Sequence, residues 1–399
     1  MREISFIHAA DLHLDSPFSG LKHIPEMILQ EIKEAAFTAF QQIILEAIYR
    51  KVDFVLLAGD LYDGENRNLR TQVRVRKEME KLKAYGIEVY IIHGNHDHLD
   101  GSWISIEQPD NVHIFSSRCE VKTFTKQNTA VNIYGYSYPT RHVKHRIIEQ
   151  YQKQEGADYH IGMLHGNVEG QNEHGQYAPF TVAELLSKHF DYWALGHIHK
   201  RQELSLSPPI IYPGNIQGRH KKESGVKGCY HVQLNGKQAK LSFIPTSQIV
   251  WDTLSVTFGK EDAFDALLSK CRAALESARS EEYRLFVRLH IVNENDSLPF
   301  DECRSELLEL LQEEEQGEHF VYPYAITIEN NLAVSDQPLF RFIQGYEWSE
   351  HVVDEAVDPL FKHPLGRKFL SLLSAEEKAE LLQEAEQLLA LQVGRGGAD

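Results

Sequence analysis

Short polar motifs that directly follow strand-like apolar runs constrain the fold of this chain more than any other feature of its sequence. Apolar runs at residues 4–8, 54–57 and 89–92 are separated by helical spacing over residues 24–50 and 66–84. This β-α-β-α-β order predicts a parallel sheet with helices packed on its faces. The motifs are Asp11-Leu12-His13, Gly59-Asp60-Leu61-Tyr62-Asp63, Gly94-Asn95-His96-Asp97, Leu164-His165-Gly166 and Gly196-His197-Ile198-His199.

The middle of the chain predicts a second sheet. Further short apolar runs follow the third strand-like run at residues 89–92, and most of them end close to a glycine, histidine or proline. We therefore expect an α/β sandwich in which two packed mixed sheets are flanked by helices. The further strands are expected at residues 131–136, 160–164, 192–195 and 209–212, with a hairpin at residues 229–244.

A change of pattern near residues 245–249 predicts a domain boundary. We assign residues 1–248 to the first domain. Alternating strand-like and helical runs predict a small α+β domain over residues 249–335. Residues 336–399 are expected to form a helical tail, in which leucines between residues 369 and 391 make an apolar stripe among glutamates.

Composition narrows the class of protein. The 399 residues carry a net charge of −17, and no apolar run approaches the roughly 18 residues of a membrane span. The four cysteines lie far apart, which argues against a disulfide framework or a zinc ribbon. The N-terminus has no signal-peptide pattern, so we expect a cytoplasmic protein. The acidic balance argues against non-specific DNA binding, but basic segments at residues 67–77, 141–146 and 219–222 leave the substrate open.

The residue types in the five motifs predict a pair of divalent metal ions. Ligands in open α/β sheets collect outside the carboxyl ends of strands, so we expect the motifs to converge there. Carboxylate, imidazole and amide donors together suit Mn, Fe or Zn better than Ca. On extended backbone, Asp11 and His13 would point to one face, and so would His197 and His199. Asp60 is the natural candidate to bridge two ions about 3.5–4 Å apart.

In this order the five motifs resemble those of the calcineurin-like metallophosphoesterases. Within that family they are most similar to the SbcD-type DNA repair exonucleases and the YhaO-type bacterial proteins. Residues 7–15 and the sequence Tyr212-Pro213-Gly214-Asn215 share this similarity, which extends over about half of the chain. The resemblance implies a four-layer fold, hydrolysis of phosphodiester bonds and a capping domain after the catalytic one.

The resemblance also implies a role for each motif residue. Two divalent ions that share Asp60 would activate a water molecule for attack on phosphorus, with Mn²⁺ expected and Fe or Zn as alternatives. His96 would protonate the leaving alkoxide, and Asp63 would orient His96. The implied metal ligands are Asp11, His13, Asp60 and His199 for one ion, and Asp60, Asn95, His165 and His197 for the other.

Candidate substrate-binding residues lie in or near the basic segments and the motifs. The basic helix over residues 66–84 is either a solvated face or a contact for the DNA backbone. The polar loop over residues 166–179 is either a lid or a surface loop. The candidates are Arg67, Arg70, His98, Asn215, Arg219 and His220.

The leading functional prediction is a DNA exonuclease or endonuclease that processes DNA ends for repair. SbcD-type nucleases bind an SMC-like coiled-coil ATPase through C-terminal helices, so the leucine stripe serves either such a partner or intramolecular packing. A homodimer through the first domain is also expected, and no membrane partner. One alternative is a phosphodiesterase or phosphatase for small nucleotides. A second is a non-catalytic regulatory subunit, against which the complete set of metal donors argues.

Overall fold

The computed structural model describes a large part of the chain, whose residues form two compact units. The larger unit comprises residues 1–256, 263–291 and 299–327, and the smaller comprises residues 257–262, 292–298 and 328–399. The described residues are 3–14, 16–18, 24–63, 68–101, 104, 106–170, 177–294, 300–315, 317–330, 350–363, 378, 381, 382 and 385.

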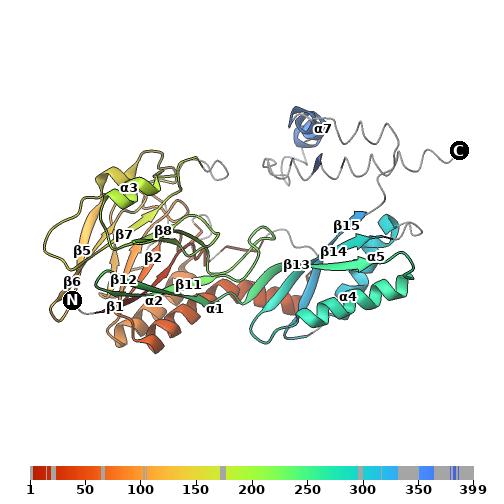
Figure 1. The fold of residues 1–399 in the computed structure, drawn as a ribbon, viewed down its shortest axis with the longest axis horizontal. Helices are drawn as coiled ribbons and strands as arrows, with labels where there is room; N and C mark the ends of the chain where they lie inside the picture. Colours follow the sequence, from red (N-terminus) through yellow and green to blue (C-terminus); the bar gives the residue numbers. More distant parts are fainter. Residues whose placement is uncertain are drawn as a thin grey trace. The chain divides into compact units, whose positions relative to one another are not determined.

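A six-stranded sheet, called sheet A, carries the first three motifs. Its strands are β1 (Ile4–Ala9), β2 (Phe54–Ala58), β3 (Glu88–Ile92), β4 (Val112–Ile114), β11 (Gly228–Asn235) and β12 (Gln238–Pro245). Their order is β12-β11-β1-β2-β3-β4, and Figure 1 labels β1, β2, β11 and β12. The four strands from β1 to β4 run parallel, whereas β11 pairs antiparallel with both β1 and β12. The predicted parallel sheet and the predicted hairpin are therefore both present.

A second six-stranded sheet, called sheet B, carries the last two motifs. Its strands are β5 (Glu120–Lys126), β6 (Thr129–Gly135), β7 (Tyr159–His165), β8 (Tyr192–Gly196), β9 (Gln202–Leu206) and β10 (Pro209–Tyr212). Their order is β5-β6-β7-β8-β10-β9. The central strands β6, β7, β8 and β10 are parallel, and the two edge strands are antiparallel.

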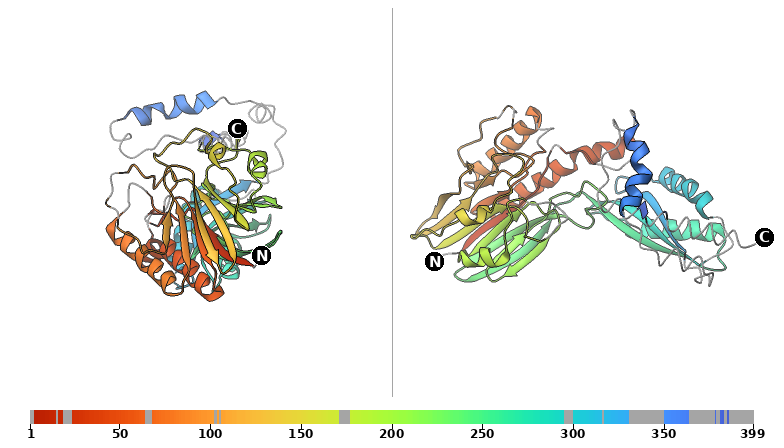
Figure 2. Two further views of the ribbon diagram at one scale, coloured as in Figure 1. Left: turned by 90° about the vertical axis from the view of Figure 1, so that its left-hand side faces the viewer. Right: turned by 90° about the horizontal axis from the view of Figure 1, so that it is seen from above.

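Helices cover the outer faces of both sheets. The helices α1 (Glu26–Arg50) and α2 (Leu69–Ala84) bury an apolar core against sheet A (Figure 2). The short α3 (Val182–Ser187) and a 3₁₀ turn at Ile147–Gln150 pack on the outer face of sheet B. A separate apolar cluster fills the space between the sheets. These four layers confirm the predicted fold class.

A three-stranded sheet follows sheet A along the chain. It consists of β13 (Ile249–Phe258), β14 (Arg284–Asn293) and β15 (Val321–Asn330), with α4 (Phe264–Ala278) and α5 (Phe300–Glu314) in the intervening segments. Trp251 stacks on Phe286 at a ring distance of 5.0 Å, and both belong to a buried cluster that includes Ile28 and Ile32 of α1. The exact domain limits that the sequence suggests stay a prediction.

The smaller unit contains one long described helix, α7 (Glu350–Lys362). Most of the predicted leucine stripe lies outside the described residues. Among the residues that the structure does describe, no helix is long and apolar enough to cross a membrane.

Candidate metal centre

All five motifs occur at the carboxyl ends of strands. The strands β1, β2 and β3 end at Ala9, Ala58 and Ile92, and β7 and β8 end at His165 and Gly196. Each of these strands lies in the parallel part of its sheet. The side chains that follow are therefore presented at one end of the two packed sheets, which is where open α/β folds bind ligands.

Left-handed backbone brings several of the predicted ligands together. The angle φ is 52° at Asp11, 45° at His13, 49° at Asp60 and 97° at His197. Such conformations cost of order 1–3 kcal/mol for a residue with a side chain, and strain of this kind clusters at functional sites. The N–H groups of Asp11 and His13 donate to the carbonyls of Gly59 and Asp60 at 3.1 and 3.0 Å. The expectation that extended backbone aligns Asp11 with His13 is therefore wrong.

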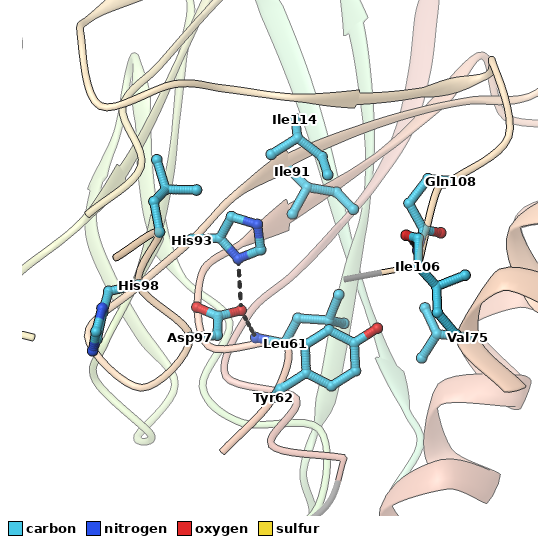
Figure 3. A pocket seen from close by; sticks show the side chains of 11 residues that line it. Leu61, Tyr62, Val75, Ile91, His93, Asp97, His98, Ile106, Gln108 and Ile114 are labelled. Atoms are coloured by element: carbon cyan, nitrogen blue, oxygen red, sulfur yellow. Dashed lines mark hydrogen bonds and ion pairs between the residues drawn. The ribbon is translucent and has the colours of Figure 1, made fainter. Parts of the chain in front are cut away.

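Asp97 braces the two loops that follow β2 and β3. Its buried carboxylate accepts hydrogen bonds from the N–H groups of Leu61 (2.9 Å) and Gly94 (2.7 Å), and it lies 3.0 Å from Nδ1 of His93 (Figure 3). Burial alone would raise the pKa of Asp97, but His93 and the bond from Gly94 outweigh it and lower the pKa to about 2. Asp97, His93 and Leu61 also line a cavity of about 190 Å³ whose walls are mainly aliphatic.

Gly94 and Gly196 allow the loops to approach one another closely. A methyl group on Gly94 would lie 2.6 Å from Nε2 of His165 and would also overlap the carboxylate of Asp60. A methyl group on Gly196 would overlap the carbonyl oxygen of Ala58. Both positions need a residue without a side chain, because predicted ligands fill the space beside Gly94 and the backbone of Ala58 fills the space beside Gly196.

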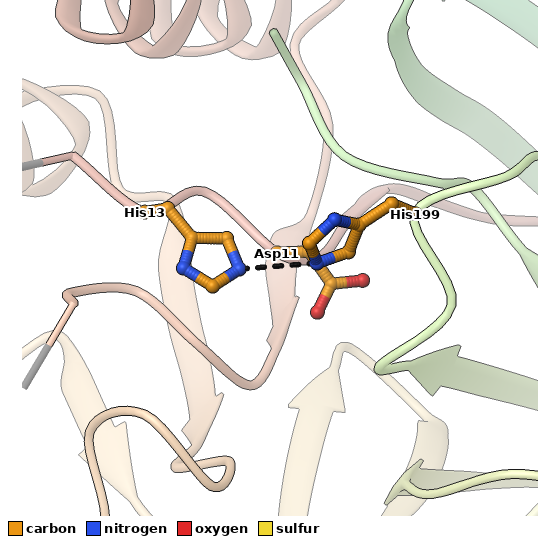
Figure 4. Close-up of side chains that lie close together, drawn as sticks. All are labelled: Asp11, His13 and His199. Atoms are coloured by element: carbon orange, nitrogen blue, oxygen red, sulfur yellow. Dashed lines mark hydrogen bonds between the residues drawn. The ribbon is translucent and has the colours of Figure 1, made fainter. Parts of the chain in front are cut away.

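Asp11, His13 and His199 form one group of donors (Figure 4). The Nε2 atoms of His13 and His199 lie 3.2 Å apart, and a carboxylate oxygen of Asp11 lies within 4.8 Å of the donor atoms of both rings. Burial, and next the charge of Arg219, hold the pKa of His13 well below its usual value. His13 is thus neutral, as a metal ligand must be.

Asp60, Asn95, His165 and His197 form the adjoining group. Oδ1 of Asn95 lies 3.0 Å from Nε2 of His165 and 3.2 Å from Nδ1 of His197. Oδ2 of Asp60 lies 3.4 Å from Nε2 of His165 and 3.8 Å from Nε2 of His13. Asp60 therefore lies between the two groups, in the position that a bridging ligand requires.

The chemistry of these donors fits divalent cations. Nδ1 of His165 donates to the carbonyl of Ala58 at 3.0 Å, so Nε2 faces the other donors. Burial lowers the pKa of His165, but the charges of Asp60 and Asp11 outweigh it and raise the pKa to about 9. The negative charge of Asp60 and Asp11 thus keeps a proton on His165, and a divalent cation bound there would displace that proton.

His96 lies beside His13 and has a carboxylate partner of its own. Its Nδ1 lies 3.0 Å from Oδ1 of Asp63, and its ring centre lies 5.0 Å from that of His13. The hydrogen bond to Asp63 is the largest influence on His96 and raises its pKa, although burial opposes the change. The side chain of His96 is 32% exposed, so a substrate can reach it.

Glu223 belongs to the site although the sequence did not indicate it. Nδ1 of His199 donates to Oε1 of Glu223 at 2.5 Å, and the N–H of Arg219 donates to Oε2 at 2.7 Å. Burial raises the pKa of Glu223, but the bond from His199 and the nearby positive charges outweigh it and lower the pKa to about 2. Glu223 lies 24 residues after His199 in a basic loop, and no spacing rule links the two.

Of the first three substrate-binding candidates, the structure describes Arg70 and His98. Arg67 is outside the described residues, as are residues 171–176 of the predicted lid or surface loop. Arg70 is exposed in the first turn of α2. His98 lines the cavity beside Asp97.

The other three candidates share the loop between β10 and β11. Asn215 is completely buried, and its Nδ2 donates to the carbonyl of Gln217 at 2.8 Å. Nδ1 of His220 accepts a hydrogen bond from the N–H of Lys222 at 3.2 Å. Arg219 is the member of the three whose charge acts on the donors of the site. Their substrate contacts stay a prediction.

Comparisons with known proteins place relatives of this chain among the phosphoesterases. Residues 4–201 match the family model described as calcineurin-like phosphoesterase. The chain is 39% identical to an uncharacterized metallophosphoesterase, YhaO, of Bacillus subtilis over 98% of each chain. It is 25% identical to the DNA double-strand break repair protein Mre11 of Sulfurisphaera tokodaii over 78% of each chain. A crystal structure of a dimetal phosphatase from Danio rerio covers 61% of this chain and 99% of its own, with 13% identity and a TM-score of 0.35.

Proposed function

Because this chain belongs to the calcineurin-like phosphoesterase family, we propose that it is a metal-dependent phosphodiesterase that cleaves DNA, as an exonuclease or endonuclease acting in end processing. Phosphoester hydrolysis follows from the family, and DNA as the substrate is our proposal. The observation that carries metal-dependent phosphoester hydrolysis is the convergence of the other six predicted donors around Asp60, beside the pair of His96 and Asp63.

The donor groups would hold two divalent ions, for which we propose Mn²⁺. When bound, such ions lower the pKa of water and neutralise phosphate oxygens. The protein contributes the orientation of the donors. Glu223 fixes the ring of His199, and the carbonyl of Ala58 fixes the ring of His165, so that in each case Nε2 faces the other donors.

His96 would act as the general acid. Its Nδ1 donates to Asp63, so that Nε2 of the protonated ring carries the proton for the leaving alkoxide. Asp63 raises the pKa of His96 and keeps more of it protonated near neutral pH. Its own pKa is lowered chiefly by the same bond, so Asp63 stays ionised while it orients the ring.

Two kinds of observation support DNA as the substrate. Several relatives whose similarity extends over more than half of this chain are described as DNA double-strand break repair proteins. Cationic side chains also adjoin the site in a chain whose net charge is −17. The charge of Arg141 acts on His96, that of Arg219 acts on Asp63, and Nζ of Lys227 donates to the carbonyl of His199. Clustered cations of this kind bind phosphate backbones.

Parallel digestion of two substrates tests this proposal. A labelled DNA duplex and bis-p-nitrophenyl phosphate would be incubated with the Mn²⁺-loaded protein at one pH and salt concentration. We expect both substrates to be cleaved, and the His96→Ala variant to cleave both at least about 100-fold more slowly. Cleavage of the small ester with none of DNA would instead support a small-nucleotide phosphodiesterase and would reject the DNA proposal.

The resemblance to SbcD-type nucleases also supports two proposals about assembly. One is a coiled-coil ATPase partner of the SMC-like type, and the other is a homodimer. Size-exclusion chromatography with light scattering tests the second directly. A mass near twice the 45.8 kDa of the chain is expected, and a mass of one chain at all protein concentrations would reject it.

A further inference from the structure

The loop between β10 and β11 brings a carboxylate and a guanidinium group to the edge of the metal centre. The loop is anchored at Gly218, whose carbonyl accepts hydrogen bonds from Nε2 of Gln217 (2.8 Å) and Nε1 of Trp251 (3.2 Å). A turn follows, in which the N–H of Glu223 donates to the carbonyl of His220 at 2.8 Å. These contacts fix the backbone on both sides of Arg219.

Glu223 contacts both a metal-donor ring and Arg219. One carboxylate oxygen accepts from Nδ1 of His199, and the other accepts from the N–H of Arg219. The first oxygen also lies 4.0 Å from a terminal nitrogen of the Arg219 guanidinium. The Glu223 side chain is 15% exposed, so these interactions are shielded from water. Replacing this carboxylate would therefore disturb the ring of His199 and the position of Arg219 together.

Arg219 has hydrogen-bonding capacity that the protein does not use. Its side chain is 13% exposed, and its Nε is buried without a hydrogen-bond partner among the described residues. Buried donors are usually paired, so a donor left open beside a site indicates a ligand. The positive charge of Arg219 acts on both His13 and Asp63, so its influence reaches a predicted metal donor and the carboxylate partner of the proposed acid.

We propose that Glu223 is a positioning residue that aligns His199 for a metal ion and holds the guanidinium of Arg219 for a non-bridging oxygen of the substrate phosphate. The proposal rests on the phosphoester hydrolysis of the proposed function, but it does not require DNA. A guanidinium suits this task because its planar fork of N–H donors matches phosphate oxygens. The competing explanation is that Arg219 only neutralises Glu223 and supports the loop.

Metal affinity tests the first half of the proposal. Mn²⁺ binding would be measured by titration calorimetry on the wild type, Glu223→Gln, Glu223→Asp and the control Glu88→Gln. Glu88 is a matched control because it pairs with a ring nitrogen of His113 at 2.6 Å, away from the donor groups. Mutating a residue that hydrogen-bonds to a metal-bound histidine typically lowers metal affinity by about 10–100-fold. We expect a loss of at least about tenfold in Glu223→Gln, a smaller loss in Glu223→Asp and none in the control.

Phosphate affinity tests the second half. The KM for bis-p-nitrophenyl phosphate and the inhibition constant of inorganic phosphate would be measured with Arg219→Met, Arg219→Lys and the control Arg272→Met. Arg272 pairs with Glu314 on the surface, remote in sequence from the motifs. We expect both constants to rise at least about tenfold in Arg219→Met, with partial rescue in Arg219→Lys. Mn²⁺ affinity should stay within about twofold of the wild type in both Arg219 variants.

Each half of the proposal can fail on its own. Unchanged Mn²⁺ affinity in Glu223→Gln, or unchanged phosphate inhibition in Arg219→Met, would overturn the proposal. If Glu223→Gln does not fold, as shown by circular dichroism, Glu223→Asp and the two Arg219 variants still decide the outcome. Failure of the DNA proposal would appear separately, as cleavage of the small ester without cleavage of DNA.

Discussion

Nδ1 of His96 lies 3.0 Å from Oδ1 of Asp63, and this bond separates the role of His96 from that of the neighbouring metal donors. The N–H of the same residue donates to Oδ1 of Asp60 at 2.8 Å, so its backbone is tied to the predicted bridge. Asn95 and His96 are adjacent in the chain, yet Asn95 contacts His165 whereas His96 contacts Asp63. One loop thus supplies both the predicted metal donor Asn95 and the proposed acid His96.

Replacing Asp63 by Asn should shift the pH dependence of hydrolysis. Asp63 is the main cause of the raised pKa of His96, so its loss lowers that pKa. The protonated acid is then lost at lower pH, and the alkaline limb of kcat/KM moves to lower pH. We expect kcat to fall by about tenfold or more at neutral pH. A profile that keeps its alkaline limb would show that His96 is not the group that titrates.

Replacing Gly94 by Ala should weaken metal binding without unfolding the protein. The new methyl group would overlap the carboxylate of Asp60 and lie 2.6 Å from Nε2 of His165. Gly317→Ala is a suitable control, since the nearest atom to its methyl group would be 3.5 Å away. Calorimetry should show a loss of Mn²⁺ affinity in Gly94→Ala alone. Equal affinity in both variants would mean that the loop can move aside at no cost.

His8 should make stability depend on pH. Its ring is buried, donates from Nε2 to the carbonyl of Leu195 and accepts from the hydroxyl of Tyr192, so it is neutral. Burial lowers its pKa to about 3, although the bond to Leu195 opposes this. The folded-state pKa lies below the usual 6.5, so stability is complete above pH 6.5 and falls as the pH drops toward 3.

Urea unfolding at pH 7 and pH 5 tests this expectation. The free energy of unfolding of the wild type should fall by roughly 2 kcal/mol through His8 between the two pH values, because the full slope of about 1.4 kcal/mol per pH unit is reached only below pH 6.5. His8→Gln cannot titrate, so its loss of stability between the two pH values should be smaller. An equal loss in both proteins would mean that other groups cause the dependence.

Replacing Trp251 by Ala should destabilise the protein and loosen the loop that carries Arg219. The side chain is 1% exposed, stacks on Phe286 and donates to the carbonyl of Gly218. Removing a buried aromatic ring of this size costs about 3–5 kcal/mol. Trp251→Phe should retain most of the packing and lose the hydrogen bond. Unfolding free energies that do not differ between Trp251→Ala and the wild type would contradict this packing.

The sequence predicted the layers and the location of the site because both depend on local patterns. Apolar runs and helical spacing define β1, β2, β3, α1 and α2, and the motifs follow the strands directly. Since parallel strands bring their carboxyl ends to the same edge, the structure places the seven predicted donors side by side. The edge strands β5 and β9 were missed, since half-exposed, polar strands lack a continuous apolar run.

Long-range contacts within the site could not be predicted. The left-handed backbone at Asp11 and His13 depends on hydrogen bonds to a loop about 48 residues away along the chain. The contact between Glu223 and His199 similarly depends on the path of the loop after β10. The sequence separation of Asp11 from Gly59, or of His199 from Glu223, follows no spacing rule that would predict either contact. The pairing of β1 with β2 in sheet A brings the first two segments together, and the loop that runs from β10 of sheet B to β11 of sheet A brings Glu223 to His199.

The number of metal ions that hydrolysis requires tests the central claim most directly. The chelated protein would be titrated with Mn²⁺ while bound metal and hydrolysis of bis-p-nitrophenyl phosphate are measured together, for the wild type and for Asp60→Asn. We predict two ions per wild-type chain, hydrolysis that appears only as both sites fill, and loss of both in Asp60→Asn. Full hydrolysis by the metal-free chain, or two ions bound to Asp60→Asn with unchanged affinity and rate, would contradict a two-metal centre bridged by Asp60.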